Sequence, residues 1–134
     1  MKGERKMVLD FERAGDMLDA IAEKLPKGIF DGLNGGVAWL PDTVTDPEFD
    51  DEVYIMGEFC CDQMGRYINL YYGSFAAMAE EEGWTQEDWE RELRETLHHE
   101  LTHHIEGLAG DRSLDRQDEQ WQREERARRR EERR

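Results

Sequence analysis

The segment from Trp84 to Leu108 constrains the fold most, because it has the start signals and the apolar spacing of one long helix. Thr85 is a good N-cap residue, and Asp88 can complete a capping box, although Glu or Gln is more usual there. Trp84 and Trp89 have the spacing of a hydrophobic staple. Large apolar residues then recur at helical intervals, at Leu93, Leu97 and Leu101. We therefore expect one capped helix that ends near Leu108, with a further stop signal at Gly110.

The residues before this helix predict a mixture of helices and strands. Asp10 can cap a first helix, and Pro26 ends it. Turn residues and apolar patterns predict the rest: a helical turn at 29–33, a turn at 34–36, strands at 37–40, 53–59 and 66–72, a loop at 42–52, a hairpin connection at 60–65 and a helix at 74–82. The order of these elements indicates an α+β domain.

Length and charge restrict the possible functions. The chain of 134 residues fits one domain, and we expect it to cover residues 8–121. A last segment begins near Ser113, and the Arg/Glu tail at 122–134 is expected to be a mixed-charge helix or a disordered tail. The tail could touch a partner, but a solvated tail is favoured. The net charge of −15 argues against nucleic acid and against an anionic membrane as partners.

Cysteine content and hydropathy point to a cytoplasmic protein. The two cysteines, Cys60 and Cys61, are adjacent, so they cannot cross-link distant segments, and we expect reduced thiols in or near a strand. The first ten residues contain no apolar signal-peptide core, and no apolar run is long enough to span a membrane.

The long helix contains a metal-binding pattern at residues 99–103, His-Glu-Leu-Thr-His. Residues i and i+4 project from the same side of a helix, about 6 Å apart along its axis. His99 and His103 can therefore bind one ion, for which zinc is the expected metal. The alternative is a histidine-rich, solvent-facing patch in which Glu100 only forms a salt bridge.

Glu100 follows His99 by about 100° around the helix, so it falls beside the metal. There it can take a proton from a metal-activated water and pass it to a leaving amine, which is peptide hydrolysis without a covalent intermediate. The neighbouring histidines are turned away from the site: we expect His98 to face solvent and His104 to border the core, where it could support a ligand by donating a hydrogen bond.

A third ligand is harder to identify from the pattern. The longer metzincin motif would need Gly and His at positions that hold Glu106 and Ala109. Asp111 follows Gly110, where the chain can turn back, so it is our first candidate. The other acidic candidates are Asp115, Asp118 and Glu106, and all of the aspartates could instead be surface capping residues.

The strand at 66–72 is the expected wall of a substrate cleft, because it could lie at a sheet edge above the helix and bind a peptide as an added strand. Tyr67, Tyr71 and Tyr72 could supply hydroxyls to an oxyanion, but packing within the sheet is the simpler role, and we assign none of them.

These motifs resemble the minimal zincin-like metallopeptidases of bacteria, in particular the Firmicutes branch. The resemblance covers roughly residues 8–121 and rests on the segments 33–36, 65–68, 71–75 and 99–110. It implies a small zincin-like α+β domain, with a short mixed sheet on the motif helix and helices at both ends. By motif match it also implies zinc at His99 and His103 with Glu100 as the catalytic base. Related short forms place Gly and then Asp soon after the second His, whereas the segment from Glu106 to Asp111 is longer here.

Two functions follow from this sequence. The first is a zinc peptidase that acts on a peptide or protein, supported by the intact Glu100, which a purely structural site would not need. The second is a non-catalytic, metal-stabilised module that binds a protein partner. A metal-dependent ribonuclease is disfavoured, because its third histidine would fall at Ala109 and because the chain is strongly acidic.

Overall fold

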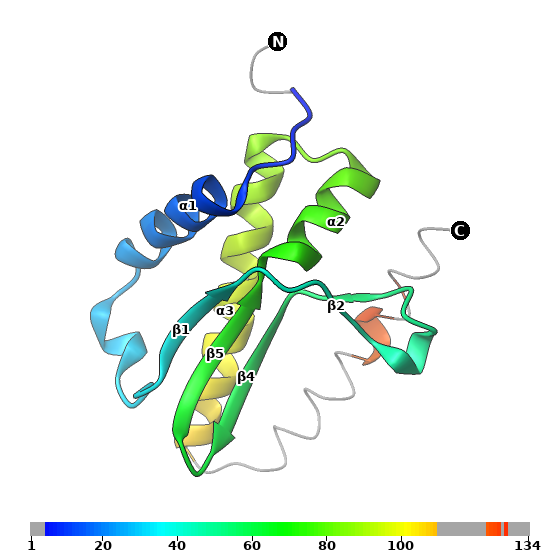
Figure 1. Cartoon of the computed structure of the whole chain (residues 1–134). Helices are drawn as coiled ribbons and strands as arrows, with labels where there is room; N and C mark the ends of the chain where they lie inside the picture. The colour runs from blue at the N-terminus through cyan, green and yellow to red at the C-terminus, as the bar shows by residue number, and fades with distance from the viewer. Residues whose placement is uncertain (1–4, 110–122, 127, 129–134) are drawn as a thin grey trace.

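The computed structural model describes residues 5–109, 123–126 and 128. The fold is α+β: a short mixed sheet packs on the long helix that carries the motif, and helices lie towards both ends of the chain (Figure 1). The elements are α1 Phe11–Glu23, η2 Lys27–Phe30, β1 Gly36–Leu40, β2 Val44–Thr45, η3 Pro47–Phe49, β3 Tyr54–Ile55, β4 Gly57–Asp62, β5 Gly65–Tyr71, α2 Tyr72–Glu82 and α3 Gln86–Leu108.

The three-stranded sheet has the order β1-β5-β4. Strand β1 runs parallel to β5, and β4 runs antiparallel to it through a tight hairpin. One face of β5, with Ile68 and Leu70, is fully buried towards α3, and alternate residues point to the opposite face. A separate two-stranded ribbon pairs β2 with β3. Because β5 is in the middle of the sheet, the expectation that the 66–72 strand forms an edge is wrong; β4 is the edge strand on the side of the cavity described below.

Helix α3 begins as its sequence predicts. The Thr85 side chain accepts a hydrogen bond from the Asp88 backbone N–H at 3.2 Å, and the Asp88 carboxylate accepts from the Thr85 N–H at 3.0 Å. The rings of Trp84 and Trp89 meet edge to face with centroids 5.3 Å apart, which confirms the staple. Leucines spaced along one face of the helix are fully buried in the core: Leu93, Leu97 and Leu101.

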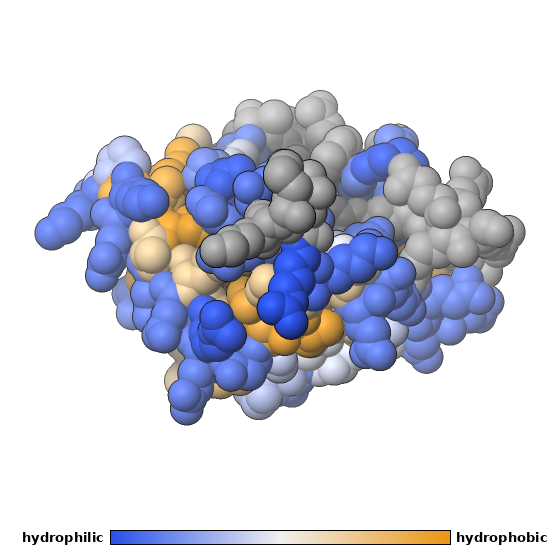
Figure 2. Space-filling model, turned by 90° about the horizontal axis from the view of Figure 1, so that it is seen from above, coloured by the Kyte–Doolittle hydropathy of each residue, from blue (hydrophilic) through white to orange (hydrophobic). Residues whose placement is uncertain are grey.

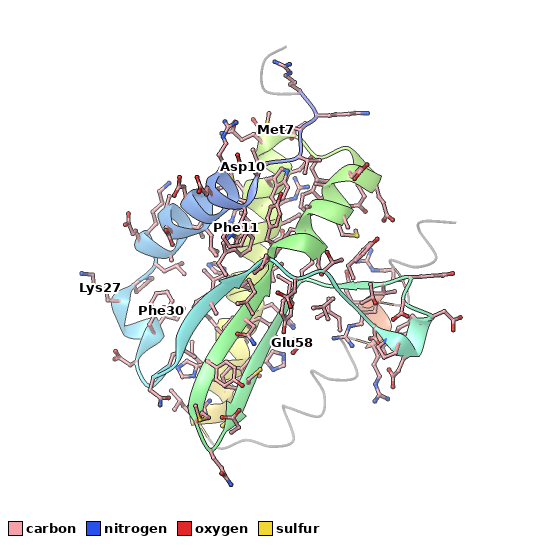
Figure 3. All side chains as sticks on the ribbon, in the orientation of Figure 1. Met7, Asp10, Phe11, Lys27, Phe30 and Glu58 are labelled. Carbon is pink, nitrogen blue, oxygen red and sulfur yellow. The ribbon has the colours of Figure 1, made fainter. Side chains whose placement is uncertain are left out.

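Helix α1 also starts at its predicted cap, because Asp10 accepts a hydrogen bond from the Arg13 N–H at 2.7 Å. Figure 3 shows Asp10 where α1 begins and the short η2 helix, from Lys27 to Phe30, beyond its far end. Phe11 stacks on Trp39 with ring centroids 5.9 Å apart and so joins α1 to β1.

The region between β1 and β5 differs most from the expectation. The predicted loop at 42–52 contains strand β2 and helix η3. The predicted strand at 53–59 is interrupted at Met56, and its second half continues through Cys60–Asp62, which the sequence pattern assigns to the hairpin connection. The actual turn is only Gln63–Met64. These shifts arise because short strands are selected by their pairing partners as much as by local pattern.

The surface seen from above is mostly hydrophilic, with apolar colour confined to small areas (Figure 2). This agrees with a chain in which 38% of the residues are charged. Within the described residues, none of the helices has the length and apolar character that crossing a bilayer requires.

Candidate active site

His99 and His103 lie on one face of α3, as the spacing predicts. Their rings are edge to face with centroids 4.9 Å apart, and both side chains are half-buried. Glu100 lies between this face and the core, and only 5% of its surface is exposed. The helix therefore presents two imidazoles to one point in space, with a carboxylate held beside them.

The two histidines fit a shared metal ion. Zinc binds imidazole nitrogens at about 2.0–2.1 Å in tetrahedral geometry, which places two ligand rings with centroids about 5 Å apart. The observed separation of 4.9 Å matches this requirement. Two partly buried imidazoles on one helix face are also donors of the type that zinc prefers.

A third ligand is not brought to this pair by the part of the chain that the structure describes, where no group of three His, Cys, Asp or Glu side chains could hold a metal. Glu106 lies within the residues that the structure describes and is half-buried, but it forms no such group with the histidines. The remaining candidates, Asp111, Asp115 and Asp118, all lie outside the described residues.

The other two histidines behave as the helical wheel predicts. His98 is exposed, and His104 is fully buried. The ring of His104 packs 5.8 Å from that of Phe59, and its Nε2 lies 2.8 Å from the Asp31 carbonyl oxygen. This bond joins His104 to Asp31, the residue that follows η2. His104 therefore stabilises the packing of α3 against the rest of the fold and does not support a metal ligand.

A cavity of about 380 Å³ opens along α3 at the motif. His99 and Glu100 line it from the helix, and the segment Val53–Gly57 lines it from β3 and the start of β4. Gly57 allows the strand to approach the helix closely, because a Cβ there would lie 2.7 Å from Leu70 Cδ2 and 3.0 Å from Thr96 Cγ2. This wall is therefore formed by Val53–Gly57, which runs through β3 to the first residue of β4, and not by the predicted 66–72 strand.

Of the four tyrosines, Tyr54 is the one that lines this cavity. The sequence pattern does not single it out, because the Tyr-rich strand at 66–72 gives the stronger signal. The Tyr72 hydroxyl donates to the Leu9 carbonyl oxygen at 2.7 Å, and Tyr67 donates to Asp62 Oδ2 at 2.9 Å on the sheet face opposite α3. The bond to Asp62 raises the pKa of Tyr67 to about 12.

The two cysteines are free and lie in β4. Burial raises the pKa of the Cys60 thiol, and the nearby carboxylates of Glu58 and Asp62 act in the same direction. Cys60 therefore stays protonated at neutral pH and is a poor nucleophile or metal ligand. This agrees with the prediction of ordinary reduced thiols.

The described part of the Arg/Glu tail contacts the body of the protein. Arg126 Nη1 lies 2.8 Å from Asp46 Oδ2, and Arg123 lies 3.7 Å from a Glu48 carboxylate oxygen. Residues 125, 126 and 128 also line the cavity beside the motif. Arg126 therefore contacts the body of the protein instead of being solvated, whereas Arg123 and Arg128 keep 64% and 57% of their side chains exposed, as a solvated tail predicts.

Comparisons with known proteins show similarity to one family and to one solved structure. Residues 57–121 match the family model described as zincin-like metallopeptidase. The fold is similar to the solved structure of a conserved hypothetical protein from Thermo thermophilus, with 35% sequence identity and a TM-score of 0.64, over 75% of this chain and 98% of that one. A comparison with curated proteins finds no significant match. Residues 57–121 contain the motif helix and two strands of the sheet beside it, and this part of the chain is similar to the zincin-like metallopeptidase family.

Proposed function

We propose that the protein is a zinc-dependent peptidase in which His99 and His103 hold the metal and Glu100 is the general base. The observation that carries this proposal is a pair of imidazoles with ring centroids 4.9 Å apart on one face of α3, beside a buried carboxylate, with His99 and Glu100 lining one cavity. We retain Asp111 as the first candidate for the third ligand, followed by Asp115 and Asp118. The assignments to a minimal Firmicutes-type member, to a cytoplasmic location and to a peptide or protein substrate belong to the same proposal.

The chain's own residues supply the proton transfers. A bound zinc ion would add Lewis acidity, which makes water nucleophilic near neutral pH and polarises a substrate carbonyl. Glu100 takes the proton from the attacking water and delivers it to the departing amine nitrogen. Its low exposure strengthens this role, because a carboxylate that is poorly hydrated holds its proton-transfer geometry against competing water.

The edge of β4 is the best support for a polypeptide substrate. Strand β5 occupies one side of β4, and the Val53–Gly57 stretch that leads into β4 lines the cavity. An extended peptide can pair with such an edge through main-chain hydrogen bonds, which fixes its register over the helix. The Tyr54 hydroxyl is then our candidate for stabilising the oxygen that becomes negative during attack.

A non-catalytic binding module is the second candidate, favoured by the lack of a third ligand among the described residues. Metal analysis of the wild type beside Glu100→Gln, with a peptide-library digest of both, separates the two. One zinc per chain in both proteins, with cleavage only by the wild type, supports the peptidase. One zinc in both with no cleavage by either supports the binding module, and no zinc in either overturns the metal site.

A further inference from the structure

The C-terminal segment occupies one side of the cavity that contains the motif. Glu125, Arg126 and Arg128 line this cavity together with His99 and Glu100. Arg126 donates from Nη1 to Asp46 Oδ2 at 2.8 Å, so its guanidinium joins the cavity lining to Asp46, which is next to the lining residues but is not one of them. A guanidinium group from a distant part of the chain is therefore bound at the edge of the proposed active site.

Asp46 is held in place to receive this group. Its Oδ1 atom accepts a hydrogen bond from the Glu48 N–H at 3.0 Å, and its backbone N–H donates to the Val53 carbonyl oxygen at 2.9 Å. Only 6% of its side chain is exposed, against 25% for the Arg126 side chain. A carboxylate this buried is stable when a cation pairs with it. Asp46 Oδ2 therefore forms a preorganised binding site for a guanidinium group, which we call the seat.

The charges around the cavity favour a cationic occupant. The tail at 122–134 contains seven arginines and four glutamates, a net +3, which leaves −18 for residues 1–121. Glu92, Glu95 and Glu100 line the cavity from α3. Opposite net charges draw the tail and the body together, most strongly at low ionic strength.

We propose that Asp46 is a specificity-determining residue that binds an arginine side chain of a polypeptide ligand, and that Arg126 occupies this seat in cis. The cleft thus accepts arginine-bearing polypeptides, and the chain's own tail competes with them. The inference rests on the proposed function for the identity of the cleft, but it is tested through binding and not through hydrolysis.

The test measures fluorescence anisotropy of the probe dansyl-Gly-Gly-Arg-Gly-Gly amide with the full chain at low salt. All proteins carry Glu100→Gln, so that the probe is not consumed, and zinc is quantified in each sample. We expect Arg126→Gln to bind the probe about tenfold more tightly than the parent, because it vacates the charged seat. Adding Asp46→Asn, which keeps an acceptor for the Glu48 N–H, should abolish this gain.

Two controls distinguish binding of arginine at Asp46 from a general effect of removing a positive charge. Arg123→Gln removes the same charge from the same segment, beside the exposed Glu48, and should bind the probe as the parent does. A probe with citrulline in place of arginine should show no gain with Arg126→Gln. The proposal is overturned by equal affinity in parent and Arg126→Gln, by an equal gain in Arg123→Gln, or by a gain that survives Asp46→Asn or citrulline. A lack of zinc or of wild-type hydrolysis would instead count against the proposed function alone.

Discussion

Arg66 and His104 form a two-point contact that joins the start of β5 to the C-terminal half of α3. Arg66 Nε donates to His104 Nδ1 at 3.1 Å, and Nη2 donates to the His104 carbonyl oxygen at 2.7 Å. Because a guanidinium can only donate, Nδ1 must accept, so the proton lies on Nε2 and is donated to the Asp31 carbonyl oxygen. The neutral imidazole is thereby fixed one residue beyond His103.

Removing this contact should destabilise the fold. Arg66→Gln leaves a buried imidazole nitrogen and a helix carbonyl without their donor, so we expect the free energy of unfolding to fall by about 1–3 kcal/mol. Arg94→Gln is the control, since Arg94 pairs with Glu90 on the exposed face of the same helix at 3.5 Å, and it should change stability by less than about 0.5 kcal/mol. Urea denaturation measures both, and equal losses would show that the contact is not specific.

The metal site should depend on two of the four histidines only. His99→Ala and His103→Ala are each expected to abolish stoichiometric zinc, because each removes one of two ligands that share the helix. His98→Ala, an exposed position on the same turn, should keep one zinc per chain. Metal analysis after exhaustive dialysis decides this, and zinc retained by both ligand variants would remove the assignment.

The capping box should contribute measurably to α3. Thr85→Ala removes the side-chain acceptor for the Asp88 N–H and should lower the free energy of unfolding by about 1 kcal/mol. Thr102→Ala makes the same substitution at an exposed position, where the hydroxyl bonds to the His98 carbonyl oxygen, and should be nearly neutral. Thermal unfolding followed by circular dichroism tests the difference, which a similar shift in both variants would contradict.

The cap should also respond to acid. The Thr85 N–H holds the pKa of Asp88 below its usual value, and Arg91 adds to this effect. A carboxyl whose pKa is lower in the folded state stabilises the protein above its unfolded pKa, about 3.9, and loses this contribution as the pH falls through the folded pKa. Asp88→Asn should therefore be less stable than the wild type at pH 7, with the difference shrinking below about pH 4. Urea midpoints across this range would show it, and a pH-independent difference would argue against it.

Close packing at Gly57 should be required for the cleft wall. Gly57→Ala places a Cβ against Leu70 and Thr96 and should cost about 1–3 kcal/mol through overpacking. Gly28→Ala is the matched control, because its nearest neighbour would be Asp31 Oδ2 at 3.8 Å, an ordinary contact. Chemical denaturation compares the two, and a neutral Gly57→Ala would mean that β4 can move away from α3 at little cost.

The elements that depend on local chemistry could be predicted from the sequence. Both long helices begin at the residues whose side chains cap them, Asp10 and Thr85, and the two motif histidines converge because helical geometry alone places them. Strand order was not predictable in the same way. Whether β4 or β5 forms the edge depends on pairing between β1 and β5, which are separated by the β2–η3–β3 excursion.

The missed parts of the site share one cause. Tyr54 lies in a predicted strand, and Asp46 lies in a predicted acidic loop, but both belong in or beside a ribbon of two-residue strands whose place in the fold the local pattern does not give. Arg126 is one of many similar residues in a low-complexity tail, and its sequence context does not distinguish it. Only the folded chain brings Tyr54 and Arg126 to the cavity and Asp46 to Arg126, because each comes from a segment distant in sequence from the motif.

Different sides of helix α3 carry the core residues and the residues of the proposed site. The leucines that hold the core together are fully buried, whereas His99 and His103 lie on another side of the helix and are only half-buried, with His99 at the cavity. The residues of the proposed site are therefore different from the residues that stabilise the fold, although both sets lie on one helix. A duplicate of this domain could exchange the proposed hydrolysis for recognition through substitutions at a few positions and still reach the same native architecture.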